Sequence, residues 1–233
     1  MTQFSHYWSR FLVNIPLIRL TFIVLLSLSF VGFSHAGAAK AALERPILIV
    51  GDSLSSEYGI RRGSGWVQLL RDRLGERYGT PPAVINASIS GDTTSGGLTR
   101  LPALLNEHQP GLVLIELGGN DALRGLALDM TRNNLIRMID LSQAAGAVTV
   151  ITGIQIPSNY GPAYTESFRN MYPEIAAATN SVLVPFLLTG LETDRNLFIE
   201  DGIHPSEAAQ PILLNNVWPA IEQTLPAPAN LAK

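Results

Sequence analysis

Five short apolar runs, rich in β-branched residues, constrain the fold of this chain more than any other feature of its sequence. Runs of this kind are typical of strands buried on both faces, as in a parallel sheet. The stretches between them carry apolar residues at helical spacing, for example Leu98, Leu101 and Leu105. This alternation of strand and helix predicts an α/β fold, a single three-layer α/β/α domain around a five-stranded parallel sheet. The runs cover residues 46–50, 83–86, 112–117, 148–152 and 182–186.

The first 42 residues differ from the rest of the chain, because they contain three basic residues and no acidic one. An apolar run spans residues 20–33, and mostly small residues follow at 34–38. A positive start, an apolar middle and a small-residue cleavage site are typical of a secretory signal peptide. The run is also shorter than the ~20 apolar residues that a membrane-spanning helix needs. We therefore predict a leader that is cleaved after Ala36 or Ala38.

This cleavage divides the chain into a signal peptide at 1–38, one domain at 39–225 and a frayed tail at 226–233. We expect an exported protein, periplasmic or secreted, that is monomeric and keeps no stable membrane anchor. The 16 Lys and Arg against 19 Asp and Glu give a net charge of -3, which lacks the basic excess that a nucleic-acid partner requires. The absence of cysteine excludes disulfides, a thiol nucleophile and cysteine-based metal sites.

Candidate catalytic residues follow the apolar runs, because ligands of open parallel sheets bind beyond the carboxyl ends of the strands. Ser53 comes directly after the first run, at the predicted start of a helical turn, and is a candidate nucleophile. The alternative interpretation is that Ser53 or Ser55 caps a helix. The Gly-x-Ser-x-Gly pattern of the α/β-hydrolases is absent, because Ser55 stands where its second glycine belongs.

The second and third runs are followed by groups that can stabilise negative charge. Gly91 can offer its backbone N–H to an oxyanion, while Asp92 or Thr93 is predicted to cap the next helix. Asn120 follows two glycines and can donate its side-chain amide to a developing negative charge. The alternative is an ordinary turn in which Asp121 caps the following helix.

Asp201 and His204 follow the fifth run after a loop, three residues apart. At that spacing on a turn, the carboxylate can orient the imidazole while the other ring nitrogen faces a nucleophile. His108 has only Glu107 and Gln109 beside it, at the end of a predicted helix, and is interpreted as a solvated or helix-end residue. His204 is therefore the candidate general base.

Taken together and in this order, these motifs resemble those of the SGNH (GDSL) hydrolase superfamily. The letters of that name correspond here to Ser53, Gly91, Asn120 and His204, and the resemblance extends from about residue 46 to about 218. Several segments are similar in particular to the periplasmic bacterial branch of acyl-CoA thioesterase I, lysophospholipase and arylesterase. Those segments are 86–93, 116–125, 157–161 and 201–205.

The resemblance implies a flavodoxin-like sheet and the hydrolysis of esters and thioesters through an acyl-enzyme, with no cofactor and no metal. Ser53 attacks the acyl carbonyl, His204 moves the proton, and Asp201 orients His204. The oxyanion is held by the N–H groups of Ser53 and Gly91 and by the Asn120 side chain. The implied substrates are small acyl esters or thioesters, namely aryl esters, acyl-CoA and lysophospholipids.

An acyl chain also needs an apolar groove, which the loops after the third and fourth runs can supply, although ordinary loop packing is the alternative for each residue. The candidates are Leu123, Leu126, Ile156, Pro157, Tyr160 and Tyr164. Three other functions stay open. They are a carbohydrate O-acetylesterase with the same catalytic residues, an acyl-binding protein without turnover, and a metal-dependent phosphoesterase. The metal ligands of the last would be Asp52, Asp121, Asp201 and His204.

Overall fold

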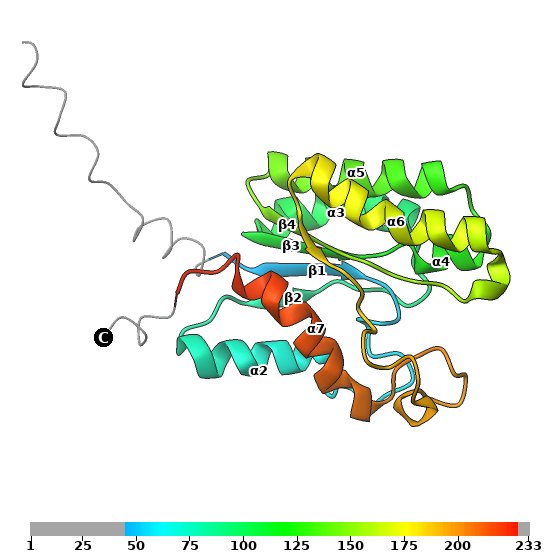
Figure 1. Ribbon diagram of the computed structural model, residues 1–233. Helices are drawn as coiled ribbons and strands as arrows, with labels where there is room; N and C mark the ends of the chain where they lie inside the picture. Colours follow the sequence, from blue (N-terminus) through cyan, green and yellow to red (C-terminus); the bar gives the residue numbers. More distant parts are fainter. Residues whose placement is uncertain (1–44, 228–233) are drawn as a thin grey trace, which may run out of the picture. The chain divides into compact units, whose positions relative to one another are not determined.

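A five-stranded parallel sheet forms the centre of the computed structural model, which describes residues 45–227. The strand order is β2-β1-β3-β4-β5, and every neighbouring pair is parallel (Figure 1). This is the flavodoxin-like order, so the predicted fold class is confirmed. The last strand is two residues shorter than predicted and ends before Pro185, which has no N–H to continue the ladder. The strands are β1 Ile47–Gly51, β2 Val84–Asn86, β3 Leu112–Glu116, β4 Val148–Thr152 and β5 Val182–Val184.

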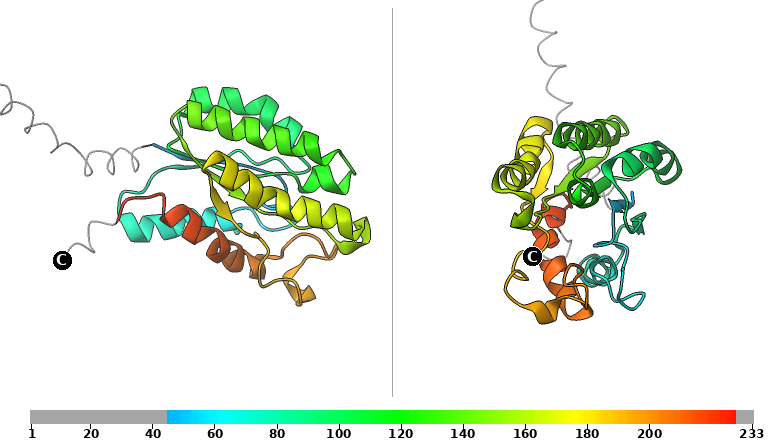
Figure 2. Two further views of the ribbon diagram at one scale, coloured as in Figure 1. Left: turned by 45° about the horizontal axis from the view of Figure 1, so that its top comes forward. Right: turned by 90° about the vertical axis from the view of Figure 1, so that its right-hand side faces the viewer.

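Helices cover both faces of the sheet, as the two views of Figure 2 show. Helices α2 and α7 pack on one face, and α3, α5 and α6 pack on the other. The longer helices are α2 Trp66–Tyr78, α3 Thr94–His108, α5 Leu128–Ala144, α6 Pro162–Thr179 and α7 Gln210–Glu222. The shorter ones are α4 Gly119–Leu123 and the 3-10 turns η1 Ser158–Tyr160, η2 Arg195–Leu197 and η3 Glu207–Ala209.

The core consists of two apolar layers, one on each side of the sheet. In β1, Leu48 and Val50 pack with α3, α5 and α6, whereas Ile47 and Ile49 pack with α2 and α7. Successive side chains of a strand point to opposite faces, so a strand covered on both sides must be apolar throughout. This double burial explains why the strands were visible in the sequence as continuous apolar runs.

The predicted signal peptide, with its cleavage site, and the end of the predicted tail lie outside the described residues. Within residues 45–227, no helix is long and apolar enough to cross a membrane. The residues proposed for catalysis all lie inside this range.

Candidate active site

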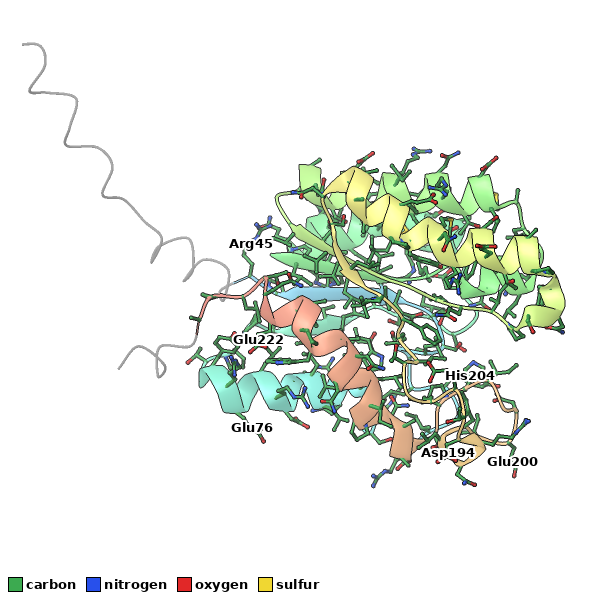
Figure 3. The ribbon with its side chains drawn as sticks, viewed as in Figure 1. Arg45, Glu76, Asp194, Glu200, His204 and Glu222 are labelled. Atoms are coloured by element: carbon green, nitrogen blue, oxygen red, sulfur yellow. The ribbon has the colours of Figure 1, made fainter. Side chains whose placement is uncertain are left out.

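Ser53, His204 and Asp201 form a continuous chain of hydrogen bonds beyond the carboxyl end of β1. The Nε2 atom of His204 lies 2.8 Å from the Ser53 hydroxyl oxygen, and its Nδ1 atom lies 2.6 Å from Asp201 Oδ2. The loop after β5 therefore brings His204 to a serine 151 residues away in the sequence. Figure 3 shows His204 at the opposite end of the domain from the labelled Arg45 and Glu222.

The Asp201 carboxylate is held by its own turn. Its Oδ1 atom accepts hydrogen bonds from the N–H groups of Ile203 (2.8 Å) and His204 (2.9 Å), which leaves Oδ2 directed at the imidazole. Burial alone would raise the pKa of Asp201. The hydrogen bonds from the His204 N–H, the imidazole and the Ile203 N–H outweigh it and hold this pKa below its ordinary value. Asp201 is consequently a charged acceptor at neutral pH, as an orienting carboxylate should be.

The predicted oxyanion donors also lie on the loops at this edge. Within the described residues, neither the Ser53 N–H nor the Gly91 N–H donates to a backbone carbonyl. Asn120, in the first turn of α4, donates one amide hydrogen to Asp52 Oδ2 at 2.9 Å and has a second hydrogen to offer. The chain enters α4 through Gly118 at φ 118°, where a Cβ atom would collide with the Tyr172 hydroxyl.

Two buried carboxyl groups, Glu116 and Asp52, lie beneath the nucleophile turn. Glu116 Oε2 accepts hydrogen bonds from the Ser55 hydroxyl (2.8 Å) and the Asp52 N–H (3.2 Å), whereas Oε1 has no partner among the described residues. Burial, reinforced by the Asp52 charge, raises the pKa of Glu116 well above its ordinary 4.5. Burial also raises the pKa of Asp52 to about 6, although the Leu54 N–H, the Asn120 amide and His204 oppose it. These shifts favour the protonated form of Glu116, while Asp52 is the acceptor that holds the Asn120 amide.

This buried acid gives a prediction for stability. The raised pKa means that Glu116 stabilises the fold fully below pH 4.5 and loses that contribution as pH rises through its folded-state pKa. In that interval the loss is about 1.4 kcal/mol per pH unit for one proton. Glu116→Gln keeps an acceptor for Ser55 and does not titrate. We expect its free energy of unfolding, measured by urea denaturation, to exceed that of the wild type increasingly as pH rises from 5. Parallel pH curves for the two proteins would contradict a raised pKa of Glu116.

The structure shows which of the serine and threonine side chains near the candidate site cap a helix. Neither Ser53 nor Ser55 caps a helix, because their hydroxyls bond His204 and Glu116, and residues 53–59 form turns rather than a helix. Thr93 is the N-cap of α3, and its side chain accepts the Gly96 N–H.

Asp121 does not cap the helix that follows it. Its carboxylate instead accepts the N–H (2.9 Å) and hydroxyl (2.5 Å) of Thr94, at the start of α3. His108 is the last residue of α3, as predicted.

The predicted acyl-groove residues are only partly brought together. Leu123 and Tyr160 are exposed, at 40% and 39%, and the Tyr160 hydroxyl donates to the Leu123 carbonyl at 3.3 Å. Pro157, three residues before Tyr160, is exposed, whereas Ile156 packs partly buried against the core. Tyr164 and Leu126 are joined by a hydrogen bond from the tyrosine hydroxyl to the leucine carbonyl.

Three further exposed apolar side chains lie on the loops that carry the catalytic residues, and the sequence analysis missed them. They are Tyr58, Ile89 and Ile203, with exposed fractions of 49%, 53% and 54%. Each lies within five residues of Ser53, Gly91 or His204, and that proximity was the available signal. Exposed apolar side chains on the loops of a polar site are typical of sites that bind apolar ligands.

The four residues considered as metal ligands do not form a ligand set. Across residues 45–227, no three His, Cys, Asp or Glu side chains are grouped so that they could hold an ion. Asp121 is engaged by Thr94 and Asp52 by Asn120.

A serine, a histidine and a carboxylate joined in this way at the edge of a parallel α/β sheet are the arrangement of a serine hydrolase. The chain belongs to the GDSL-like Lipase/Acylhydrolase family, whose model matches residues 49–211. The matched range includes every residue of the hydrogen-bonded chain and both additional predicted oxyanion donors, Gly91 and Asn120.

Three curated relatives match most of this chain. Esterase TesA of Pseudomonas aeruginosa is 50% identical over 80% of this chain and 92% of its own length. The arylesterase of Vibrio mimicus is 45% identical over 79% of this chain and 91% of its own. Thioesterase 1/protease 1/lysophospholipase L1 of Escherichia coli K12 is 41% identical over 75% and 82%. A crystal structure of TesA superposes with a TM-score of 0.75, covering 78% of this chain and all of the other.

Proposed function

We propose that this protein hydrolyses carboxylic esters and thioesters through an acyl-enzyme formed on Ser53. The observation that carries the proposal is the continuous hydrogen-bonded chain from the Ser53 hydroxyl through His204 to Asp201. A serine hydroxyl is a weak nucleophile until an adjacent base accepts its proton, and a Nε2 to Oγ distance of 2.8 Å is suited to that transfer.

In the acylation step, the Ser53 oxygen attacks the acyl carbonyl while its proton passes to Nε2 of His204. The imidazolium that forms is stabilised by the charged Asp201 on Nδ1. The tetrahedral oxyanion accepts hydrogen bonds from the N–H groups of Ser53 and Gly91 and from the free amide hydrogen of Asn120. When the intermediate collapses, the bond to the leaving group breaks, and His204 protonates the departing alkoxide or thiolate.

In the deacylation step, His204 takes a proton from water, and the resulting hydroxide attacks the acyl-enzyme. The second tetrahedral intermediate expels Ser53, which regains its proton from His204. One water is consumed, and the products are a carboxylic acid and an alcohol or a thiol. Every proton transfer uses the same imidazole nitrogen, so no cofactor or metal is required.

The substrates are acyl esters and thioesters with an apolar acyl group, including aryl esters, acyl-CoA and lysophospholipids. Relatives named as an esterase, an arylesterase and a thioesterase/lysophospholipase support this range. The test is a hydrolysis panel on purified residues 39–233, with p-nitrophenyl esters and CoA esters of increasing chain length, lysophospholipids and acetylated sugars. Turnover that depends on the acyl chain supports the proposal. Turnover confined to acetylated sugars indicates the carbohydrate O-acetylesterase instead.

Acyl-chain preference is expected to depend on the exposed pair Leu123 and Tyr160. A polar change such as Leu123→Asn removes apolar contact with a long chain but leaves the bonds of Ser53 intact. We expect kcat/KM for a medium-chain ester to fall by about 10-fold relative to an acetyl ester, since losing apolar contact of about one or two methylenes has an effect of that size. The panel above measures this ratio. An unchanged ratio in both Leu123→Asn and Tyr160→Ser would place the acyl chain elsewhere.

We also propose where in the cell this enzyme acts. The charge and hydropathy pattern of residues 1–38 supports export with cleavage after Ala36 or Ala38, which leaves a monomeric periplasmic or secreted enzyme. Mass spectrometry of the protein recovered from the periplasmic fraction of an expressing bacterium tests this. We expect a chain that begins at Gly37 or Ala39, and an intact chain that sediments with membranes would contradict it.

A further inference from the structure

The turn that carries Ser53 continues into a tyrosine that contacts the candidate general base. The ring centroids of Tyr58 and His204 are 4.5 Å apart, and the two ring planes are inclined by 47°. This separation is at the short end of the range over which aromatic rings make favourable contact. Tyr58 is 49% exposed, so its ring is not simply a part of the hydrophobic core.

The hydrogen bonds of His204 hold its ring mainly within the plane of the ring. The ring is bonded at Nε2 to Ser53 and at Nδ1 to Asp201, and bonds of this kind resist displacement in the plane more strongly than tilting out of it. His204 also lies between η2 and η3, on a segment without long helices or strands, and the Asp201 side chain is 34% exposed. A ring packed beside the imidazole adds resistance to such tilting.

The position of Tyr58 is set by an unusual residue that precedes it. Glu57 has φ 62°, a left-handed conformation that residues other than glycine seldom adopt. Its carboxylate accepts the Gly63 N–H with both oxygens (3.0 and 2.9 Å) and the Gly65 N–H at 2.9 Å. These bonds close the loop around one carboxylate, and they maintain the strained conformation that directs Tyr58.

The same loop is attached to the segment that carries His204. The Arg61 N–H donates to Glu207 Oε1 at 2.9 Å, and its guanidinium lies 3.5 Å from Glu207 Oε2. At Gly59 the loop passes so close to Ile199 that a Cβ atom would collide with that side chain. The loop and the His204 segment are therefore held in contact with each other, although they are far apart in the sequence.

We propose that Tyr58 is a positioning residue for His204, whose ring packs on the imidazole and keeps Nε2 on Ser53 while Nδ1 stays on Asp201. Glu57 acts one step further back, because its carboxylate holds the loop in the conformation that places Tyr58. The proposal rests on the proposed function, in which His204 is the base. It adds two residues, Tyr58 and Glu57, on which proton transfer depends although neither exchanges the proton.

The first test compares Tyr58→Ala with Tyr58→Phe, using a short p-nitrophenyl ester. Loss of the ring is expected to lower kcat about 10- to 100-fold with little change in KM, since misplacement of a catalytic group by ~1 Å has an effect of that size. Phenylalanine keeps the ring contact and should restore kcat to within about twofold of the wild type. Leu141→Ala, which removes an exposed apolar side chain on α5, is the control.

A spectroscopic readout separates positioning from a general loss of structure. In the wild type, the short Nδ1 to Asp201 bond should give a downfield imidazole N–H proton signal by NMR. We expect this signal to broaden or disappear in Tyr58→Ala and to persist in Tyr58→Phe, with unchanged circular dichroism and Tm in both. A sharp, unshifted signal in Tyr58→Ala would show that the ring does not restrain the imidazole.

The role of Glu57 is tested with a double-mutant cycle. Glu57→Ala should lower kcat much as Tyr58→Ala does, and the double variant should fall little further, because both changes remove the same contact. Glu192→Ala is a matched control, since Glu192 also uses a loop carboxylate to accept a glycine N–H, that of Gly190. Additive losses in the cycle would contradict the dependence of Tyr58 on Glu57.

Failure of this inference is distinguishable from failure of the proposed function. If Ser53→Ala is inactive while Tyr58→Ala keeps wild-type kcat and the NMR signal, only the positioning role is wrong. If Tyr58→Ala raises KM and leaves kcat unchanged, the ring contacts substrate instead, and positioning is again contradicted. If the wild type hydrolyses no ester or thioester, the proposed function itself fails, whereas the NMR comparison still reports on the contact.

Discussion

Ser53→Ala is expected to abolish ester hydrolysis, lowering kcat by a factor on the order of 10⁵ to 10⁶, which is the loss seen when the nucleophile of a serine triad is removed. The change deletes the oxygen that attacks the carbonyl and leaves His204 without the hydroxyl at 2.8 Å. The fold should be unaffected, because Ser53 is only partly buried and its hydroxyl bonds nothing else in the described structure. Initial rates with a p-nitrophenyl ester, at enzyme concentrations high enough to measure the residual activity, give the value.

Two comparisons make this result specific. Ser56→Ala removes a hydroxyl in the same turn that has no hydrogen-bond partner among residues 45–227, so it should keep near wild-type kcat. The double variant Ser53→Ala/His204→Ala should be about as inactive as Ser53→Ala alone. Residues that act as one catalytic unit have non-additive effects, so once the nucleophile is gone, removal of the base costs little more activity. If Ser53→Ala retained substantial turnover, the acyl-enzyme would be wrong. If it bound acyl ligands and the wild type also failed to turn over, the protein would be an acyl-binding protein.

Asn120→Ala is expected to lower kcat by about 10²- to 10³-fold, equivalent to about 2.7 to 4 kcal/mol of transition-state stabilisation, with KM nearly unchanged. The amide donates one hydrogen to Asp52 and keeps the other for the oxyanion, which exists only in the transition state and intermediates. An interaction made only there affects kcat rather than ground-state binding. Steady-state kinetics over a full substrate range separate the two constants.

The matched control is Asn134→Ala. Asn134 is also partly buried, and its amide donates to the Thr94 hydroxyl at 3.0 Å. We expect this variant to lose some stability and to keep its kcat. Asp52→Asn should give an intermediate loss of kcat, because an amide facing the Asn120 amide cannot accept both hydrogen bonds that the carboxylate now accepts. Equal effects of Asn120→Ala and Asn134→Ala on kcat would contradict an oxyanion role.

The fold was accessible from the sequence because the sheet is buried on both faces. Continuous apolar runs marked all five strands, and only the predicted strand ends differ from the observed ones. For example, β5 ends before Pro185, although its apolar run continues to residue 186. The strand order followed from the family resemblance rather than from the runs. Apolar periodicity records which residues are buried but does not record which strand lies beside which.

The candidate site was predictable as a set of residues, because each follows a strand and the strands all end at one edge. The supporting contacts were not. Glu116 appears in the sequence only as the charged residue within the third apolar run, and nothing nearby in sequence shows that it is buried and bonded to the Asp52 N–H. Tyr58 is five residues from Ser53 in the sequence. Its ring nevertheless contacts His204, which lies on the loop after β5, far from Tyr58 in the sequence.

The sequence by itself determined the class of fold and supplied the candidate nucleophile, base and carboxylate, since these depend on local burial patterns and on residue types at fixed spacing. Only the tertiary structure decided how they are held. Hydrogen bonds of 2.6 to 2.8 Å across the site, the raised pKa of Glu116 and the contact of Tyr58 with His204 all require segments distant in sequence to meet. The physical reason is that pKa values and orientation depend on distances and desolvation in three dimensions, which no local pattern of residues specifies.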